Sequence, residues 1–235
     1  MPDIPIFRDR TDAGRQLAQR LQKYAGRLRL LVLGIPRGGV PVAFEVASAL
    51  KAPLDIFVSR KLGVPGQEEL AFGAVASGGA CLLDDEIVTA AGISASDIDR
   101  VIQRERHELE RRERVFRAGR PPRRVEGMTV VLVDDGIATG ASVGVAVAAL
   151  RQQGPAKIVV AAPVVPASTL QRLQREVDDV VCLYSPKKFY AIGEFYDDFG
   201  QVTDEQVIGL LDLASRRDCP SPHVPPARQS GKVDG

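Results

Sequence analysis

Asp134 and Asp135 are the residues of this sequence best suited to chemistry, because they follow directly on the aliphatic run Thr129–Val133. Two adjacent carboxylates repel each other and are costly to remove from water. Such a pair is tolerated where it faces solvent, binds a cation or accepts hydrogen bonds from a ligand rich in hydroxyl groups. Two neighbouring ribose hydroxyls meet the last description, so the pair is a candidate diol site at a strand end.

The residues that follow, Gly136–Ser142, are mostly small. Gly140 and Ala141 let a ligand approach the backbone closely, and the start of a helix offers free N–H groups and partial positive charge to an anion. Thr139 and Ser142 add hydroxyl donors. A phosphate binder beside a diol binder predicts a sugar 5-phosphate site. The alternative is an ordinary strand-to-helix turn with solvent-facing acids.

A second loop, GIPRGG at Gly34–Gly39, follows the first aliphatic run. Its glycines permit unusual backbone angles and leave N–H groups bare, and Arg37 beside Gly38 and Gly39 adds a cation. The loop is therefore a candidate for binding a phosphate group, although a common strand-to-helix turn explains the same residues.

Arg60 and Lys61 follow the second aliphatic run. A guanidinium and an ammonium group there are suited to pairing with diphosphate oxygens. The segment Lys61–Leu70 contains glycine and proline and is predicted to be a polar loop that closes as a lid and excludes water. A solvated surface loop is the alternative.

The segment Lys187–Phe199 concentrates aromatic residues in a chain in which they make up only 5%. Aromatic faces with acids nearby suit a flat heterocycle, through stacking and hydrogen bonds to its edge. Packing in the protein core is the alternative for the same side chains.

The elements that must position these residues alternate between short aliphatic runs, which predict strands, and helical apolar spacing. This alternation predicts an α/β fold: a parallel sheet flanked by helices on both faces, with ligands at the carboxyl ends of its strands. The expected strands are 28–35, 53–59, 70–76, 80–84, 129–133, 158–162 and 179–183, and the expected helices are 9–24, 40–50, 141–153, 166–176 and 204–215.

Residues 85–125 break the alternation and are predicted to be a helical insertion. Its charged helix, about Ser96–Arg117, interleaves arginines with glutamates such as Glu105 and Glu108 at spacings that allow pairs within the helix. This pattern favours a solvated or subunit-contacting helix. The alternative is a basic arm for nucleic acid.

The composition limits the class of protein further. A formal charge of +1 gives no global case for nucleic acid or a membrane surface, and no apolar run approaches the length of a membrane span. Three scattered cysteines indicate reduced thiols and a cytoplasmic setting, and two histidines without ligand-spaced partners argue against zinc. We expect one domain over residues 1–216 and a disordered, proline-rich tail over 217–235.

The string VVLVDDGIATGAS, residues 130–142, is similar to the PRPP-binding motif of type I phosphoribosyltransferases, PRPP being 5-phosphoribosyl diphosphate. A looser likeness extends over about residues 5–215. The resemblance implies the family fold, with a small hood at about 185–200, and the use of PRPP with Mg²⁺.

The resemblance also implies roles for individual residues. Asp134 and Asp135 would hold the ribose hydroxyls, with Mg²⁺ bound mostly through substrate and water. Arg60 and Lys61 resemble a pair in the catalytic loop of orotate- and adenine-type members. The implied 5-phosphate residues are Ala138, Thr139, Gly140, Ala141 and Ser142, the pyrophosphate residues are Arg37, Gly38, Gly39, Arg60 and Lys61, and the base-pocket residues are Lys187, Phe189, Ile192 and Phe195.

Ala138 departs from the hypoxanthine/guanine-type pattern, in which an aspartate at this position is thought to handle the purine N7 proton. Alanine is what adenine-type members show. The motif therefore supports PRPP use and leaves the nucleobase open.

These observations predict Mg²⁺-dependent transfer of a 5-phosphoribosyl group from PRPP to a nucleobase, with release of pyrophosphate, as in nucleotide salvage. A homodimer is one option for the assembly. Two alternatives remain: a PRPP-sensing regulator that binds RNA or a partner protein with little transferase activity, and a structural subunit that binds no PRPP.

Overall fold

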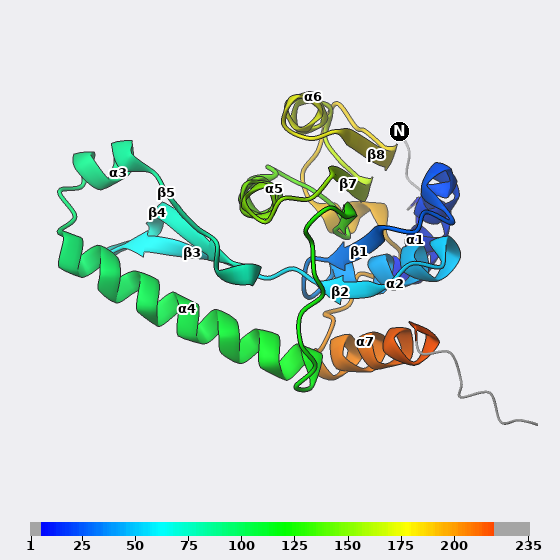
Figure 1. Cartoon of the computed structure of the whole chain (residues 1–235). Helices are drawn as coiled ribbons and strands as arrows, with labels where there is room; N and C mark the ends of the chain where they lie inside the picture. Colours follow the sequence, from blue (N-terminus) through cyan, green and yellow to red (C-terminus); the bar gives the residue numbers. More distant parts are fainter. Residues whose placement is uncertain (1–5, 219–235) are drawn as a thin grey trace, which may run out of the picture.

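A computed structural model describes residues 6–218, and at its centre lies a five-stranded sheet in the order β2-β1-β6-β7-β8. The strands are β1 Leu30–Gly34, β2 Leu54–Ile56, β6 Thr129–Val133, β7 Lys157–Val164 and β8 Asp179–Tyr184. Every neighbouring pair is parallel (Figure 1). The carboxyl ends of all five strands therefore share one edge, where open α/β sheets bind their ligands.

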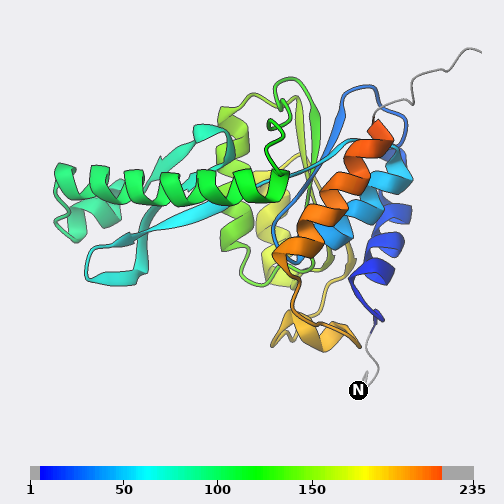
Figure 2. The same ribbon diagram turned by 90° about the horizontal axis from the view of Figure 1, so that it is seen from below.

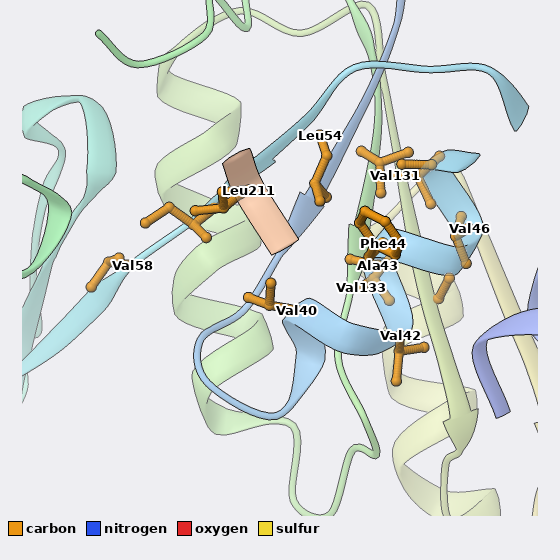
Figure 3. Packing of buried hydrophobic residues seen from close by; sticks show 14 of the residues in the cluster. Val40, Val42, Ala43, Phe44, Val46, Leu54, Val58, Val131, Val133 and Leu211 are labelled. Carbon is orange, nitrogen blue, oxygen red and sulfur yellow. The ribbon is translucent and has the colours of Figure 1, made fainter. Parts of the chain in front are cut away.

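Helices cover both faces of this sheet. They are α1 Arg10–Arg20, α2 Gly39–Leu50, α5 Ala141–Gln152, α6 Ala167–Glu176 and α7 Asp204–Asp218. Successive strand residues point to opposite faces, so Val32 and Val131 pack with α1, α2 and α7, while Leu31 and Leu132 pack with α5 and α6. Figure 3 shows part of the first cluster around α2. Burial on both faces explains the continuous aliphatic runs, and the predicted α/β architecture is confirmed.

A second, antiparallel sheet projects from this core together with two helices (Figures 1 and 2). Its elements are β3 Ser59–Val64, β4 Gln67–Ala76, β5 Cys81–Leu83, α3 Asp85–Ala90 and α4 Ala95–Arg117. We call residues 59–117 the lobe. The predicted charged helix is α4, which lies along the small sheet and reaches α7 with its C-terminal end. The α4 helix begins after Ser94, whose side chain accepts a hydrogen bond from the backbone N–H of Asp97.

The prediction of a polar lid loop over Lys61–Leu70 is wrong. The segment is a β-hairpin in which β3 and β4 pair around the turn Pro65–Gly66. Gly66 has a φ of +81°, which glycine adopts without steric cost. Leu62, Gly63 and Val64 are all buried, and the pairing register shifts on both sides of Gly63, so the segment lacks the alternation of buried and exposed residues that predicts a strand.

Two expected boundaries also shift. The second core strand ends at Ile56 rather than near Ser59, because Ser59 already begins β3 of the lobe. The α7 helix continues to Asp218, and the rest of the expected tail lies outside the described residues. Within residues 6–218, no helix is long and apolar enough to cross a membrane.

A buried polar network fixes the root of the lobe to the core. Arg117 of α4 donates to Asp55 of β2 at 2.8 Å and to Glu113 at 2.9 Å. Ser77 donates to Glu113 at 2.6 Å and accepts the backbone N–H of Val58 at 2.8 Å. Because Arg117 and Asp55 are both buried, this pairing sets the direction in which α4 leaves the core.

Candidate active site

The acidic pair and the GIPRGG loop lie side by side, because β1 and β6 are parallel neighbours with Gly34 opposite Val133. A Cβ atom at Gly38 would lie 2.0 Å from the Oδ2 of Asp135, and one at Gly39 would lie 2.7 Å from the Val133 carbonyl oxygen. Both positions therefore require glycine. The peptide bond between Pro36 and Arg37 in this loop is cis.

Asp135 is held by the protein itself. Its Oδ2 accepts from Arg10 Nε at 2.7 Å, and both side chains are nearly buried. Arg10 also donates to the Gly200 carbonyl oxygen at 2.7 Å, and its guanidinium lies 4.0 Å above the ring of Phe199. The Tyr196 hydroxyl donates to the Asp135 carbonyl oxygen at 2.5 Å. Helix α1 thus binds the Asp135 carboxylate through Arg10, and the segment after β8 binds the Asp135 backbone carbonyl through Tyr196.

Asp134 is in a different state from its neighbour. Its Oδ1 accepts the backbone N–H of Asp135 at 2.9 Å, and no residue within 6–218 forms an ion pair with it. Burial, followed by the charge of Asp135, raises the pKa of the Asp134 carboxyl well above its usual value. Of the predicted pair, Asp134 is the carboxylate free to accept hydrogen bonds from a diol.

Two carbonyl groups of the small-residue segment after the pair point toward α6. The Ala138 carbonyl oxygen accepts from Thr169 Oγ1 at 2.8 Å, and that of Thr139 accepts from Arg172 Nη2 at 2.7 Å, both donors lying on α6. Gly140 has a φ of +73°, and a Cβ there would lie 2.6 Å from the same guanidinium nitrogen. In the described chain, the backbone N–H groups of Thr139 and Gly140 have no acceptor. Together with the start of α5, they can bind an anion.

The aromatic segment is brought against this turn at one point. A Cβ at Gly136 would lie 2.4 Å from Ile192 Cγ2, so Ile192 sits directly over the residue that follows the acidic pair. Phe189 and Phe195 stack with ring centroids 6.0 Å apart, and Phe195 also meets Tyr184 at 5.6 Å. Both phenylalanines are partly buried.

The predicted cations are distributed unevenly. Arg37 lies on the loop after β1, where its Nη1 is 3.5 Å from Asp204 Oδ1. Arg60 and Lys61 lie on β3 of the lobe, where Arg60 pairs with Glu105 at 2.6 Å and Lys61 with Glu69 at 3.1 Å. Neither lines the cavity beside Arg37, and Lys187 is exposed.

Sequence reasoning missed four arginines: Arg10, Arg172, Arg111 and Arg112. Arg10 and Arg172 contact the acidic pair and the small-residue turn, whereas Arg111 and Arg112 line a cavity of about 480 Å³ that also contains Arg37 and Ser142. Arg10 stood at the polar start of a helix, and the α4 arginines stood among many charges. Only the packing of their helices shows that these four arginines lie at the site or line the cavity.

The described side chains form no enclosed metal site, since no group of three or more His, Cys, Asp or Glu residues in 6–218 could hold an ion. Asp134 nevertheless offers a carboxylate that has no ion-pair partner within residues 6–218. That donor set fits a hard cation such as Mg²⁺, which keeps several waters and binds through one or two carboxylates and substrate oxygens.

Comparisons with known proteins bear on the family of this chain. Residues 7–199 match the family described as phosphoribosyl transferase domain. Two curated proteins of Mycobacterium tuberculosis, from strains CDC 1551 and H37Rv, are each 48% identical over 213 residues, covering 91% of this chain and 48% of their own. Both are named only provisionally as phosphoribosyl transferases, and the chain spans about half of their length.

A solved structure gives the same result for the fold. The crystal structure of TT1426 from Thermus thermophilus is 43% identical, with a TM-score of 0.77, and the match covers 87% of this chain and 97% of that one. The family model covers most of the chain and includes both the acidic pair and the small-residue turn. The chain belongs to the type I phosphoribosyltransferase family.

Proposed function

We propose that this protein transfers a 5-phosphoribosyl group from PRPP to a nucleobase and releases diphosphate. One observation carries the proposal: three features meet at one edge of the sheet. They are the Asp134 carboxylate, which has no ion-pair partner within residues 6–218, the glycine loop in contact with Asp135, and the turn in which the N–H groups of Thr139 and Gly140 are free. Together they supply a diol acceptor and groups that can bind anions, which are the parts that one phosphorylated pentose requires.

The three parts have separate tasks in this proposal. The turn Ala138–Ser142 binds the 5-phosphate through its N–H groups and the start of α5. Asp134 accepts hydrogen bonds from the ribose hydroxyls. Asp135 keeps its ion pair with Arg10 and contributes its remaining acceptor capacity. The division follows from the unequal surroundings of the two carboxylates.

Bond cleavage at C1 of the ribose builds positive charge on the sugar and negative charge on the departing diphosphate, and no protein nucleophile is required. Catalysis then consists of positioning and electrostatic stabilisation. Arg37 presents a cation to the diphosphate, and the backbone N–H groups of Arg37 and Gly38 have no acceptor within the described residues, whereas that of Gly39 donates to the Ile35 carbonyl oxygen at 3.0 Å. Asp134 fixes the ribose. Mg²⁺ bound by substrate oxygens, water and Asp134 would neutralise charge on the diphosphate.

The base pocket is proposed at the hood. Ile192 packs on Gly136 next to the acidic pair, and Phe189 and Phe195 stack behind it. Their surface suits a flat, apolar heterocycle. Lys187 is exposed and available for an exocyclic oxygen. Alanine at position 138 leaves no carboxylate for a purine N7 proton, so the choice among bases rests on the hood.

A panel of nucleobases, each supplied with PRPP and Mg²⁺, tests the proposal by the diphosphate released. We expect turnover with at least one base and its loss in Asp134→Asn. The matched control is Asp198→Asn, which changes an exposed carboxylate of the hood. Binding of PRPP without turnover of any base would remove the transferase assignment and favour a PRPP-sensing role in nucleotide metabolism.

A further inference from the structure

A cavity of about 480 Å³ continues from the Arg37 loop toward the lobe. Its walls combine two aromatic rings and several aliphatic side chains with three guanidinium groups, whereas Asp204 is the carboxylate among them. The lining residues are Ile35, Pro36, Arg37, Phe57, Val58, Ser59, Arg111, Arg112, Val115, Phe116, Ser142 and Asp204. Arg37 and Ser142 belong to the two loops to which we assign the phosphates of the substrate. The cavity is therefore continuous with the proposed site.

Helix α4 presents one face to this cavity. Arg111, Arg112, Val115 and Phe116 occupy positions i, i+1, i+4 and i+5, so all four face the cavity from one side of the helix. The buried pairing of Arg117 with Asp55, at the end of the same helix, fixes that direction. The arginines are thus part of the cavity wall.

Glu108 orients both guanidinium groups and leaves donors free. Its carboxylate accepts from Arg111 Nε at 2.8 Å and Nη2 at 2.9 Å, and from Arg112 Nε at 3.0 Å. The bonds from Arg111 and then Arg112 lower the pKa of Glu108 to about 2, so it stays ionised at neutral pH. A guanidinium has five N–H donors, and most of those on Arg112 have no partner within the described residues. Pre-oriented free donors of this kind bind phosphate oxygens.

We infer that Arg111 and Arg112 bind the diphosphate of the substrate together with Arg37, so that the lobe supplies the cations of the leaving-group site through α4. This inference rests on the proposed function. It gives the two α4 arginines the task that the sequence assigned to Arg60 and Lys61, which hold ion pairs within the lobe.

The test measures binding of inorganic diphosphate and of ribose 5-phosphate by calorimetry in metal-free buffer, so that only the charges of the protein act. Arg111→Gln and Arg112→Gln should each weaken diphosphate binding roughly tenfold, the scale of a hydrogen bond to a charged group. Binding of ribose 5-phosphate should stay unchanged, which also reports an intact fold. Arg114→Gln is the matched control, because Arg114 is an exposed neighbour outside the cavity.

A variant that should strengthen diphosphate binding provides a second test. Asp204→Asn removes the cavity carboxylate and frees Arg37, so diphosphate binding should become roughly threefold stronger, the scale of an exposed ion pair. Unchanged diphosphate affinity in Arg111→Gln and Arg112→Gln, or an equal loss in Arg114→Gln, overturns the inference while the proposed function stands. If the wild type binds diphosphate through these arginines but no ribose 5-phosphate, the α4 arginines still form a diphosphate site and the proposed function fails.

Discussion

The carboxyl edge of the parallel sheet and the lobe differ in how far their polar and charged groups are paired. At the sheet edge, Asp134 has no ion-pair partner and the backbone N–H groups of Thr139 and Gly140 have no acceptor within the described residues. In the lobe, Arg60 pairs with Glu105 and Lys61 with Glu69, and at the root of the lobe Arg117 pairs with Asp55 of β2. Unsatisfied groups in the first region indicate a ligand, and satisfied groups in the second indicate architecture.

The face of α4 that lines the cavity falls between these two cases. Arg111 and Arg112 share one carboxylate, Glu108, and keep further donors free. A shared partner orients the two guanidinium groups without satisfying them. The comparison therefore separates arginines that hold the lobe in place from arginines that can receive a ligand.

The largest effect is expected where the lobe joins the core. Arg117→Met leaves Asp55 and Glu113 as unpaired carboxylates, Asp55 being buried, and removal of one partner from a buried ion pair costs about 3–5 kcal/mol. Urea unfolding measures the loss. Arg114→Met, the same change on the exposed face of α4, should stay within about 0.5 kcal/mol of the wild type. Equal losses in the two variants would show that the network does not stabilise the lobe.

The next predicted effect, on stability, has opposite signs for substitutions of the adjacent residues Asp135 and Asp134. Asp135→Asn removes the charge that pairs with nearly buried Arg10 and should destabilise the protein by about 3 kcal/mol. Asp134→Asn removes a carboxylate that folding makes harder to ionise, so it should stabilise the ligand-free protein, and each kcal/mol gained raises the melting temperature by about 2–4 °C. Destabilisation by both substitutions would contradict the unequal surroundings of the pair.

The pH dependence of Asp134 follows from the same shift. Its folded pKa is raised, so its contribution to stability is fully present below the unfolded value of 3.8 and is lost as pH rises through the folded pKa. The melting temperature of the wild type should therefore fall relative to Asp134→Asn as pH rises through that window. Binding of ribose 5-phosphate should strengthen over the same window, because the ionised carboxylate is the better acceptor. A constant difference in melting temperature would refute the shift.

The smallest effect is expected at the hairpin. Arg60→Gln with Lys61→Gln should change diphosphate affinity by less than about threefold, since Arg60 pairs with buried Glu105, Lys61 pairs with Glu69 and neither side chain lines the cavity. The assignment of these residues to the diphosphate stays a prediction until this is measured. A loss as large as that of Arg111→Gln with Arg112→Gln would restore it and would require the hairpin to move over the site.

Much of the sheet and its binding edge could be predicted from the sequence, because the signals there are local. The run Thr129–Val133 is buried on both faces, and the residues to which we assign ligand binding follow it directly. Gly34–Gly39 follows its own strand in the same way, and parallel pairing alone brings the two loops together.

The remaining features depend on contacts between distant segments. Arg10 meets Asp135 across 125 positions, and no spacing in the sequence links them. Arg111 and Arg112 were two among many arginines, and only the docking of α4 through Arg117 shows which of them face the cavity. The hairpin was hidden because Leu62, Gly63 and Val64 are buried in succession, with register shifts on both sides of Gly63, so the segment lacks the alternation of a strand.

A crystal structure with ribose 5-phosphate and Mg²⁺ tests the central claim most directly. We expect the phosphate to lie against the N–H groups of Thr139–Ser142 and the ribose hydroxyls to lie within hydrogen-bonding distance of Asp134. Sugar density elsewhere, or Asp134 drawn into an ion pair with one of the protein's own arginines, would contradict the account.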